Sequence, residues 1–370
     1  MGVVPCTDQA MWDAFVAGAG GGLLQSWRWG EFRRSQGWDV LRLMVLADEA
    51  PMGRRSPRGA AQVLVRTIAP LGSFLYAAEG PVLAAAEWEN GAPALAPLLD
   101  TIQARGRARG ALTLRVDPLT GVRSVAETLA AHGLRRASDN VQPEATAVVD
   151  LQPSEDELLA GLEKGARYLV RHAGRKGARM RIGTEGDIPT LARMIFETGQ
   201  RKGFGIRHEA YLRALYRALS PYGLADLIVV EVKGATVASM IGAGYGSRYC
   251  SLYAAGNELG RKIGAQYLLH WEGMMQGKRR GCTLYDFRGV GAATGDDQLA
   301  GLTFFKSRFG TRREDFPGAW DHVYRPLSYN LFTRARWLRG ATLKRARHFR
   351  RESSADSSDT VERGVRGHER

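Results

Sequence analysis

The sequence predicts a mixed α/β protein, of the α+β type, made of two similar units in tandem. At 370 residues the chain is longer than one hydrophobic core normally serves, which favours two domains. In both halves, segments with apolar residues at helical spacing precede runs that alternate like β-strands. The motif Leu-Tyr-Ala-Ala closes a predicted strand in each half, within "FLYAAEG" (74–80) and "SLYAAGN" (251–257), which fits a duplication.

The first unit is assigned to residues 1–150. Gly37 is a suitable C-cap for its second helix, and Pro118 ends its last predicted strand. The segment 49–59 combines two prolines, two glycines and three arginines, which is typical of a flexible loop between strands. The expected elements are helices over 9–18 and 25–37, a strand over 38–47, two strands within 60–83 interrupted at 70–72, a helix over 87–109 and a strand over 111–118.

The second unit is assigned to residues 151–323. Ser154 is followed three residues later by Glu157, the pattern of a capping box at a helix start. Turn signals at Lys233-Gly234 and Gly246-Ser247 divide a run of β-type residues into an antiparallel meander. The expected elements are a helical segment over 153–177, helices over 186–204 and 207–223, three strands within 224–256, a helix over 264–281 and a strand over 283–290.

The C-terminal part differs in composition from the two units. Residues 334–351 contain eight Lys or Arg and no acid. They are expected either to form a basic helix that meets phosphates or anionic lipid, or to pack as a terminal helix with a solvated basic face. The segment from about 324 to 350 is expected to complete the first unit, and the polar tail over 352–370 is expected to be disordered.

The composition limits the environment and the partners. With 52 Lys+Arg against 38 Asp+Glu, the net charge is +14. This surplus favours polyanionic partners such as nucleic acid, phosphorylated ligands or anionic lipid, although a GC-rich genome, which encodes arginine where others encode neutral residues, explains it equally well. Three widely separated cysteines suggest neither disulfides nor zinc, which fits a reducing cytoplasm. Without a leader or an apolar run of about 18 residues, we expect a cytoplasmic protein that at most contacts a membrane surface.

The motif content favours acyl or group transfer between bound substrates. The P-loop, dinucleotide-binding, zinc-protease and serine-hydrolase motifs are missing from the sequence, and its seven histidines are scattered. One pattern, "GRKIGAQYLL" (260–269), is similar to the pyrophosphate loop of acetyl-CoA-dependent N-acetyltransferases because Arg261 and Gly264 precede a helix. However, Gln266 occupies the position of a small residue in that loop, and an ordinary helix start explains the segment as well.

Seven segments read together resemble the Fem peptidyltransferase family (FemA, FemB, FemX and relatives). They keep the family's order and span residues 23–329, nearly the whole chain. The chain has no sustained heptad pattern, so it resembles the compact FemX-like members that lack a coiled-coil arm. The segments are "LLQSWRWGEFRRSQGW", "APLGSFLYAAEGPVL", "LRVDP", "KGARYLVRHAGRKG", "LYAAGN", "LYDFRGV" and "GLTFFKSRFG" followed by "WDHVYRPLSY".

The resemblance implies two tandem N-acetyltransferase-like (GNAT) domains and a tRNA-dependent aminoacyltransferase. Such an enzyme moves an amino acid from aminoacyl-tRNA to the stem-peptide amine of a peptidoglycan precursor, UDP-MurNAc-pentapeptide or lipid II, in cross-bridge formation and cell-wall biogenesis. We expect no cofactor, a monomer, and a cytoplasmic location with peripheral contact at the inner membrane face. Two alternatives stay open: an acetyl-CoA-dependent N-acyltransferase acting on a small amine, and a non-catalytic tRNA- or membrane-binding protein.

The resemblance implies four substrate-binding residues on the acceptor side. Arg33 of "SWRWGEFRR" matches a basic position, often lysine in relatives, that contacts nucleotide phosphates. Arg207 and Tyr211 of "IRHEAY" have a spacing that places both side chains on one helix face, where relatives bind acceptor phosphates. Tyr253 of "LYAAGN" matches another acceptor contact. Considered alone, these residues would be surface arginines and core tyrosines.

The resemblance also implies three residues near the chemistry. Lys306 is expected to stabilise the oxyanion and the leaving group, and Phe305 to stack on a nucleobase such as the terminal adenine, while Phe304 is expected in the core. Considered alone, Lys306 would be a solvated charge on an amphipathic turn. Asp117 of "LRVDP" is expected to help place the acceptor, because an aspartate with an unshifted pKa near 4 is a poor base at neutral pH. The family's substrate-assisted chemistry suggests that the substrate's own groups take up the proton.

Overall fold

The computed structural model describes residues 1–47, 56–70, 72–122, 124–202, 207–291, 300–331 and 333–334. Contacts group the chain into one compact unit over Met1–Tyr324 and a second over Arg325–Arg370. The predicted basic segment after Arg334, the predicted tail over 352–370 and most of the predicted loop over 49–59 lie outside the described residues. None of the helices in the described ranges is long and apolar enough to span a bilayer.

The first half of the larger unit is built on an eight-stranded sheet in the order β1-β2-β3-β4-β6-β15-β7, with β5 paired to β3. Neighbouring strands are antiparallel except β4 and β6, which run parallel from Ser73↔Ala111 to Glu79↔Pro118. The strands are β1 (Gly2–Pro5), β2 (Asp39–Leu46), β3 (Pro57–Ile68), β4 (Gly72–Glu79), β5 (Val82–Leu83), β6 (Ala111–Pro118), β7 (Arg135–Arg136) and β15 (Trp320–Val323).

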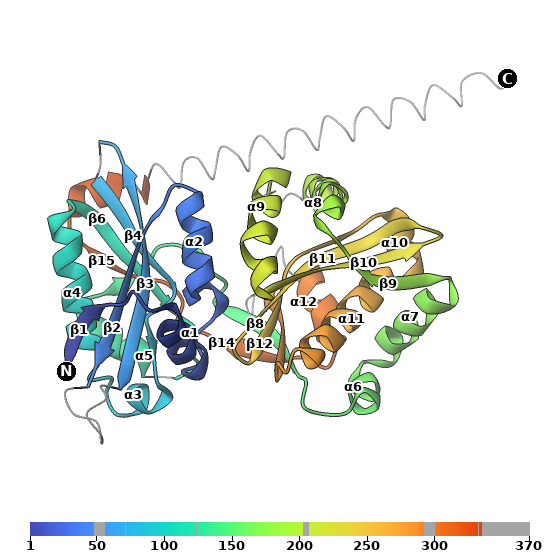
Figure 1. Cartoon of the computed structure of the whole chain (residues 1–370), viewed down its shortest axis with the longest axis horizontal. Coiled ribbons are helices and arrows are strands. Elements are labelled where there is room, and N and C mark those ends of the chain that lie inside the picture. The colour runs from blue at the N-terminus through green and yellow to red at the C-terminus, as the bar shows by residue number, and fades with distance from the viewer. Residues whose placement is uncertain are drawn as a thin grey trace. The chain divides into compact units, whose positions relative to one another are not determined.

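Helices cover both faces of this sheet, with α4 and α5 on one face and α1 and α2 on the other (Figure 1). The apolar residues of α4 recur at helical spacing and are fully buried against the sheet, because Leu95, Leu98, Leu99 and Ile102 share one helix face. The helical elements are α1 (Gln9–Gly18), η1 (Leu23–Gln25), α2 (Trp27–Ser35), α3 (Ala85–Glu89), α4 (Leu95–Ala108) and α5 (Val125–Ala131).

The single helix predicted over 87–109 is wrong, because the chain forms two helices there, α3 and α4. Gly91 and Ala92 between them have positive φ values of 79° and 52°. Pro93 follows, and a proline inside a helix removes a hydrogen bond and clashes with the preceding turn. The loop predicted over 49–59 is also too long, since β3 already begins at Pro57.

The second half is built on a seven-stranded sheet in the order β14-β8-β13-β12-β11-β10-β9. The predicted antiparallel meander within 224–256 is confirmed, since β10 pairs with β11 and β11 with β12 in antiparallel register. The strands are β8 (Ala145–Asp150), β9 (Ala178–Ile182), β10 (Ala225–Val232), β11 (Ala235–Tyr245), β12 (Arg248–Gly256), β13 (Leu284–Gly289) and β14 (Arg312–Asp315).

Strands β12 and β13 are parallel but stay paired only from Arg248↔Leu284 to Cys250↔Asp286. Beyond these three pairs the strands separate, whereas β4 and β6 of the first sheet stay paired to their ends. The two parallel pairs therefore differ: one is closed and the other opens at the level of Asp286.

In Figure 1, α7 and α11 lie on one face of the second sheet and α8 and α9 on the other. The predicted capping box is confirmed: Glu157 N donates to Ser154 Oγ at 3.3 Å and Ser154 N donates to Glu157 Oε2 at 2.8 Å. The segment 153–177 forms two helices rather than one, because Leu162 between them is extended. The helical elements are α6 (Glu155–Gly161), α7 (Lys164–Arg175), η3 (Glu185–Asp187), α8 (Ile188–Lys202), α9 (Glu209–Leu219), η4 (Ser220–Tyr222), α10 (Glu258–Ile263), α11 (Ala265–Arg279) and α12 (Ala300–Ser307).

The two halves exchange segments of chain. Strand β8 ends at Asp150 and so lies within the predicted first unit, yet it pairs with β13 and β14 of the second sheet. Strand β15 lies within the predicted second unit (151–323), yet it pairs with β6 and β7 of the first sheet. Because both halves belong to one compact unit over Met1–Tyr324, the division into two domains stays a prediction.

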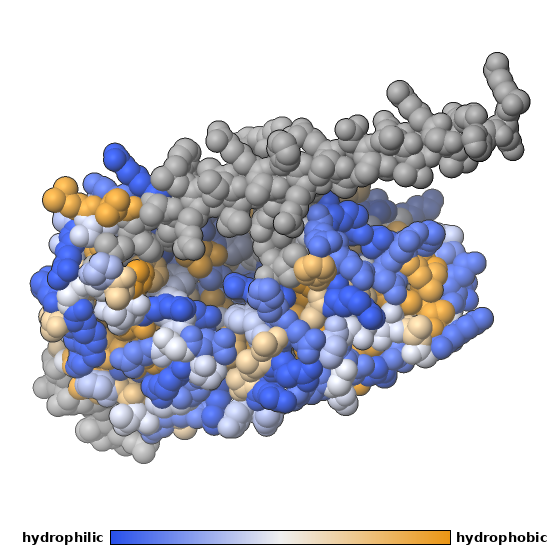
Figure 2. Space-filling model, turned by 90° about the horizontal axis from the view of Figure 1, so that it is seen from above, coloured by the Kyte–Doolittle hydropathy of each residue, from blue (hydrophilic) through white to orange (hydrophobic). Residues whose placement is uncertain are grey.

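The face visible in Figure 2 is largely hydrophilic where it is described, with hydrophobic residues in small groups.

Candidate functional site

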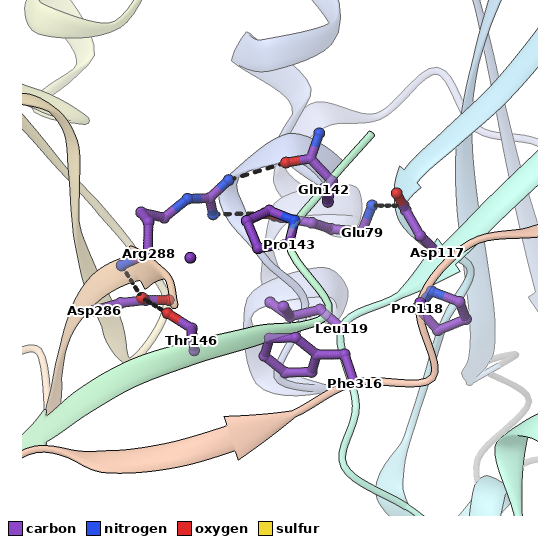
Figure 3. Close-up of a pocket in the computed structure, with 12 residues that line it drawn as sticks. Glu79, Asp117, Pro118, Leu119, Gln142, Pro143, Thr146, Asp286, Arg288 and Phe316 are labelled. Atoms are coloured by element: carbon purple, nitrogen blue, oxygen red, sulfur yellow. Dashed lines mark hydrogen bonds and ion pairs between the residues drawn. The ribbon is translucent and has the colours of Figure 1, made fainter. Parts of the chain in front are cut away.

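A pocket lies where the ends of β4 and β6 meet β13 (Figure 3). Parallel strands end at the same edge of a sheet, so the register of β4 and β6 places Glu79 and Asp117 side by side. Strand β13 contributes Asp286 and Arg288 from the second half. The residues that line the pocket are Glu79, Asp117, Pro118, Leu119, Gln142, Pro143, Thr146, Asp286, Arg288, Gly289, Phe316 and Gly318.

Asp117 lines this pocket and is buried, with 6% of its surface exposed. Its Oδ2 accepts a hydrogen bond from Tyr76 Oη at 2.6 Å, and its Oδ1 accepts one from Glu79 N at 2.7 Å. Burial raises the pKa of the Asp117 carboxyl to about 7, although both hydrogen bonds favour the charged form. The expectation of an unshifted pKa is wrong, because the strand that carries Asp117 is completely buried.

Five residues close a ring of hydrogen bonds around the pocket. Arg288 donates to Glu79 Oε1 at 2.8 Å and to Gln142 Oε1 at 3.2 Å. Gln142 Nε2 donates to Tyr76 Oη at 3.3 Å, and Tyr76 donates to Asp117. The ring closes through the backbone of Glu79, which donates to Asp117. The two halves of the compact unit are thus joined at the pocket by side chains that could orient a polar substrate.

Sequence reasoning missed Glu79 and Tyr76. Both lie in the Leu-Tyr-Ala-Ala echo, where Tyr76 corresponds to Tyr253, which was singled out. Glu79 stands where the second copy has Gly256, so one copy has an acid at the end of an apolar strand. Comparing the two copies position by position could have found them. An acid at the end of an apolar strand in only one copy indicates a buried carboxylate that needs a partner.

Lys306 of α12 is buried, with 5% of its surface exposed. Its Nζ donates to the carbonyl oxygens of Arg288 at 3.0 Å and Gly289 at 2.5 Å. Burial lowers the pKa of Lys306 to about 8, against the opposing effect of the Asp286 carboxylate. The solvated lysine expected from the segment alone is therefore excluded. Through Arg288, Lys306 is connected to the pocket that contains Asp117.

The two phenylalanines before Lys306 differ in burial from what we expected, which was Phe304 in the core and Phe305 free to stack on a nucleobase. Phe304 is 65% exposed, so its expected place in the core is wrong. Phe305 is half-buried in an aromatic cluster, with its ring centroid 4.9 Å from that of Tyr267 and 5.4 Å from that of Phe309. The short helix α12 turns the side chains of 305 and 306 inward and that of 304 outward. The stacking role of Phe305 stays a prediction.

The four residues expected on the acceptor side come together from α2, the segment before α9, α9 itself and β12. The rings of Tyr211 and Tyr253 lie 6.2 Å apart, and the Arg207 guanidinium lies 4.9 Å from the Tyr211 ring centroid. Burial lowers the pKa of Arg33, and nearby Tyr211 raises it. Burial raises the pKa of Tyr211. The cluster combines cationic and aromatic groups, which suits a phosphorylated ligand.

One detail of this prediction is wrong. Arg207 does not share a helix face with Tyr211, because α9 begins at Glu209 with His208 as its N-cap. Arg207 reaches the Tyr211 ring from the segment before the helix.

The segment that is similar to a pyrophosphate loop is mostly helical. Arg261 lies inside α10, which Asn257 caps by accepting a hydrogen bond from Gly260 N at 2.8 Å. Its side chain donates to the Gly256 carbonyl at 3.2 Å. Gly264 has φ of 77° and separates α10 from α11. The Arg261 guanidinium therefore holds the neighbouring backbone in this structure.

Comparison with known proteins agrees with this architecture. A model described as an acetyltransferase (GNAT) domain matches residues 162–307. The chain is 29% identical over 232 residues to the lipid II:glycine glycyltransferase of Staphylococcus aureus strain MRSA252, which covers 60% of this chain and 53% of that protein. The same enzyme of strain USA300 matches equally. This chain spans about half the length of the curated relatives it matches.

A crystal structure of FemX superimposes with a TM-score of 0.80, at 22% identity, covering 90% of this chain and 99% of that chain. The chain therefore has the fold of FemX. A tandem GNAT protein from the clavulanic acid biosynthesis pathway also matches, with a TM-score of 0.53, 13% identity and coverage of 87% and 98%. These matches agree with the expected resemblance to the Fem family and confirm the α/β fold of two GNAT-like halves.

Proposed function

We propose that this protein is an aminoacyltransferase that moves an amino acid from aminoacyl-tRNA to the stem-peptide amine of a peptidoglycan precursor. The activity of its relatives, glycine transfer to lipid II, supports a cross-bridge reaction. The observation that carries the proposal is the connection between a titratable carboxyl and a buried cation. Asp117, with a pKa of about 7, and Lys306, with a pKa of about 8, both connect to Arg288.

In the proposed reaction the acceptor amine attacks the ester carbonyl of the donor. A carbon–nitrogen bond forms, the carbon–oxygen bond to the ribose breaks, and the ribose oxygen leaves with the proton that the amine has lost. Lys306 is protonated below its pKa of about 8, so it can stabilise the oxyanion and then the leaving oxygen. Asp117 accepts a hydrogen bond from the amine and, with a pKa of about 7, takes up the proton that the amine loses.

The Arg33, Arg207, Tyr211 and Tyr253 cluster binds the acceptor in this proposal. UDP-linked and lipid-linked precursors both carry a pyrophosphate, which two arginines can hold with charge-assisted hydrogen bonds. The tyrosine rings provide an apolar wall next to these charges. We propose that the protein works at the cytoplasmic side of the membrane, where either precursor is available.

Transfer with purified substrates tests the proposal. The chain is incubated with glycyl-tRNA, and then with tRNAs charged with the other amino acids, together with UDP-MurNAc-pentapeptide or detergent-solubilised lipid II. Mass spectrometry of the acceptor is expected to show addition of one aminoacyl residue. If no aminoacyl-tRNA supports transfer, while acetyl-CoA stabilises the protein in thermal shift and acetylates an amine, the proposal is wrong.

A further inference from the structure

Helix α7 presents a cationic face to solvent. Lys164, Arg171 and Arg175 are exposed and Arg167 is half-exposed, at positions three, four or seven residues apart, so they share one side of the helix. The opposite side packs into the core of the second half, beside α11 in Figure 1. The buried residues of α7 are Ala166, Val170 and Ala173.

No carboxylate in the described ranges lies within 4.0 Å of the cationic groups of Lys164, Arg167, Arg171 or Arg175. Other surface arginines of the same half do have such partners. Arg213 and Arg217 of α9, for example, lie 2.8 and 2.6 Å from the carboxylate of Glu185. The charge of α7 is therefore uncompensated, and it is available to an anionic partner.

Aromatic rings lie among these cations. Tyr168 is 53% exposed, stacks on His172 with ring centroids 5.4 Å apart, and has the Arg175 guanidinium 5.5 Å from its ring centroid. Rings placed between arginines suit a ligand that has both phosphates and planar groups.

The face continues towards Lys306. At the start of α7, Glu163 pairs with Arg308 at 3.1 Å, and Arg308 follows α12 directly. The Arg308 guanidinium lies 5.8 Å from the ring centroid of Phe304, the exposed neighbour of Phe305 and Lys306. Cations and exposed rings therefore form a strip from α7 to the helix that carries the buried lysine.

The chemistry of this strip favours RNA over a membrane surface. An interfacial helix inserts apolar side chains into the bilayer, but the apolar residues of α7 point into the core. Arginine binds phosphate with bidentate geometry, and its guanidinium stacks on rings. The helix has 12 residues and so extends roughly 18 Å, which matches several successive phosphates of one strand.

We propose that the α7 face, together with Phe304, binds the RNA that carries the donor aminoacyl group. The face contacts the sugar–phosphate backbone, and Phe304 stacks on an unpaired base at the outer side of α12, the helix that carries Lys306. This inference rests on the proposed function, because it assigns the surface to the donor of that reaction.

The test measures RNA binding apart from catalysis. A fluorescein-labelled, uncharged acceptor-stem minihelix with an unpaired 3′ end is titrated with protein at several salt concentrations, and anisotropy reports binding. The variant Arg171→Gln/Arg175→Gln is compared with Arg213→Gln/Arg217→Gln, which removes the same charge from a paired surface. We expect the α7 variant to bind at least about tenfold more weakly and to lower the salt slope by about 1.5 to 2.

The matched control is expected to bind within about twofold of the wild-type protein, since its arginines are engaged by Glu185 and Glu209. Phe304→Ala is expected to weaken binding about tenfold without changing the salt slope, because stacking involves no counterion release. Thermal unfolding of each variant shows whether the fold is kept.

Three results would overturn the inference. The α7 variant could bind the minihelix like the wild-type protein, or the control could lose as much affinity as the α7 variant. Alternatively, the wild-type protein could bind no RNA, while α7 is needed for binding to vesicles of equal parts phosphatidylglycerol and phosphatidylcholine. Single-turnover transfer from aminoacyl-tRNA separates these results from failure of the proposed function: transfer that survives with an α7 variant contradicts only the surface assignment.

Discussion

Arg288 donates a hydrogen bond to the Glu79 carboxylate at 2.8 Å, and both residues have positive φ, 62° and 56°. A residue with a side chain in this left-handed region costs of the order of 1–3 kcal/mol unless its surroundings hold it there. Here the ion pair joins β4 to β13, and the carbonyl oxygen of the same Arg288 accepts from Lys306. Arg288 therefore links the carboxyls of the pocket to the buried lysine.

Removing the charge of Glu79 should destabilise the protein. In Glu79→Gln the Arg288 guanidinium stays mostly buried without its partner, and we expect a loss of about 2–4 kcal/mol in the free energy of unfolding. Urea denaturation followed by circular dichroism measures this loss. Glu79→Gln/Arg288→Gln should recover part of it, because neither charge is then left unpaired. Additive losses in the double variant would show that the ion pair is not coupled.

Lys306→Met should keep the fold and lower the rate of aminoacyl transfer by at least about a hundredfold, because the proposed mechanism uses its charge to stabilise the oxyanion. The wild-type rate should also fall as the pH rises through about 8, where Lys306 loses its proton. Steady-state transfer assays between pH 6 and pH 9 measure both effects. A wild-type rate in Lys306→Met would remove Lys306 from the proposed mechanism.

Asp117→Asn should lower the rate and abolish the acidic limb of the pH profile. In the wild-type protein the active carboxylate forms as the pH rises through about 7. If Asp117 only places the acceptor, the variant should lose activity but keep the acidic limb.

The raised pKa of Asp117 also has a consequence for stability. Its pKa is about 7 in the folded protein and 3.8 in the unfolded chain, so the folded state binds more protons between these values. The contribution of Asp117 to stability is therefore complete below about pH 4 and is lost as the pH rises through about 7. The difference in Tm between Asp117→Asn and wild type should become more positive from pH 5 to pH 8. A constant difference would argue against the raised pKa.

Arg207→Ala should raise the KM for the acceptor about tenfold and change kcat little, because the contact is made equally in the ground state and the transition state. Arg213→Ala is the control and should leave KM unchanged, because Arg213 lies in the following helix α9 and is paired with Glu185 and Glu209. An Arg207→Ala variant with normal KM and reduced kcat would contradict the assignment of Arg207 to acceptor binding. Titration with the UDP-linked and the lipid-linked precursor shows which acceptor uses this contact.

The two phenylalanines should separate stability from donor binding. Phe305→Ala removes a half-buried ring from an aromatic cluster and should cost about 3 kcal/mol of stability. Phe304→Ala should leave stability within about 0.5 kcal/mol and raise the KM for aminoacyl-tRNA, since its ring is 65% exposed. If Phe305→Ala kept its stability and raised the KM for aminoacyl-tRNA as much as Phe304→Ala, this result would support a stacking role for Phe305.

Local patterns predicted much of the secondary structure. The β10–β12 meander and the Ser154 capping box were expected because alternation, turn residues and caps act over a few residues. The prediction of one helix over 87–109 was wrong because hydrophobic spacing was given more weight than the helix-breaking residues Gly91 and Pro93. Strand β9 was missed because no element was assigned between the helical segments predicted over 153–177 and 186–204.

The sequence by itself determined most of the helices and strands, the positive net charge, and the residue types available for acyl transfer. Only the tertiary structure decided that Asp117 has a raised pKa, that Glu79 meets Arg288 and that Lys306 is buried. Propensity and periodicity act between neighbours in the chain. Burial and pairing depend on segments such as β4 and β13, which lie about two hundred positions apart and meet only when both sheets have packed.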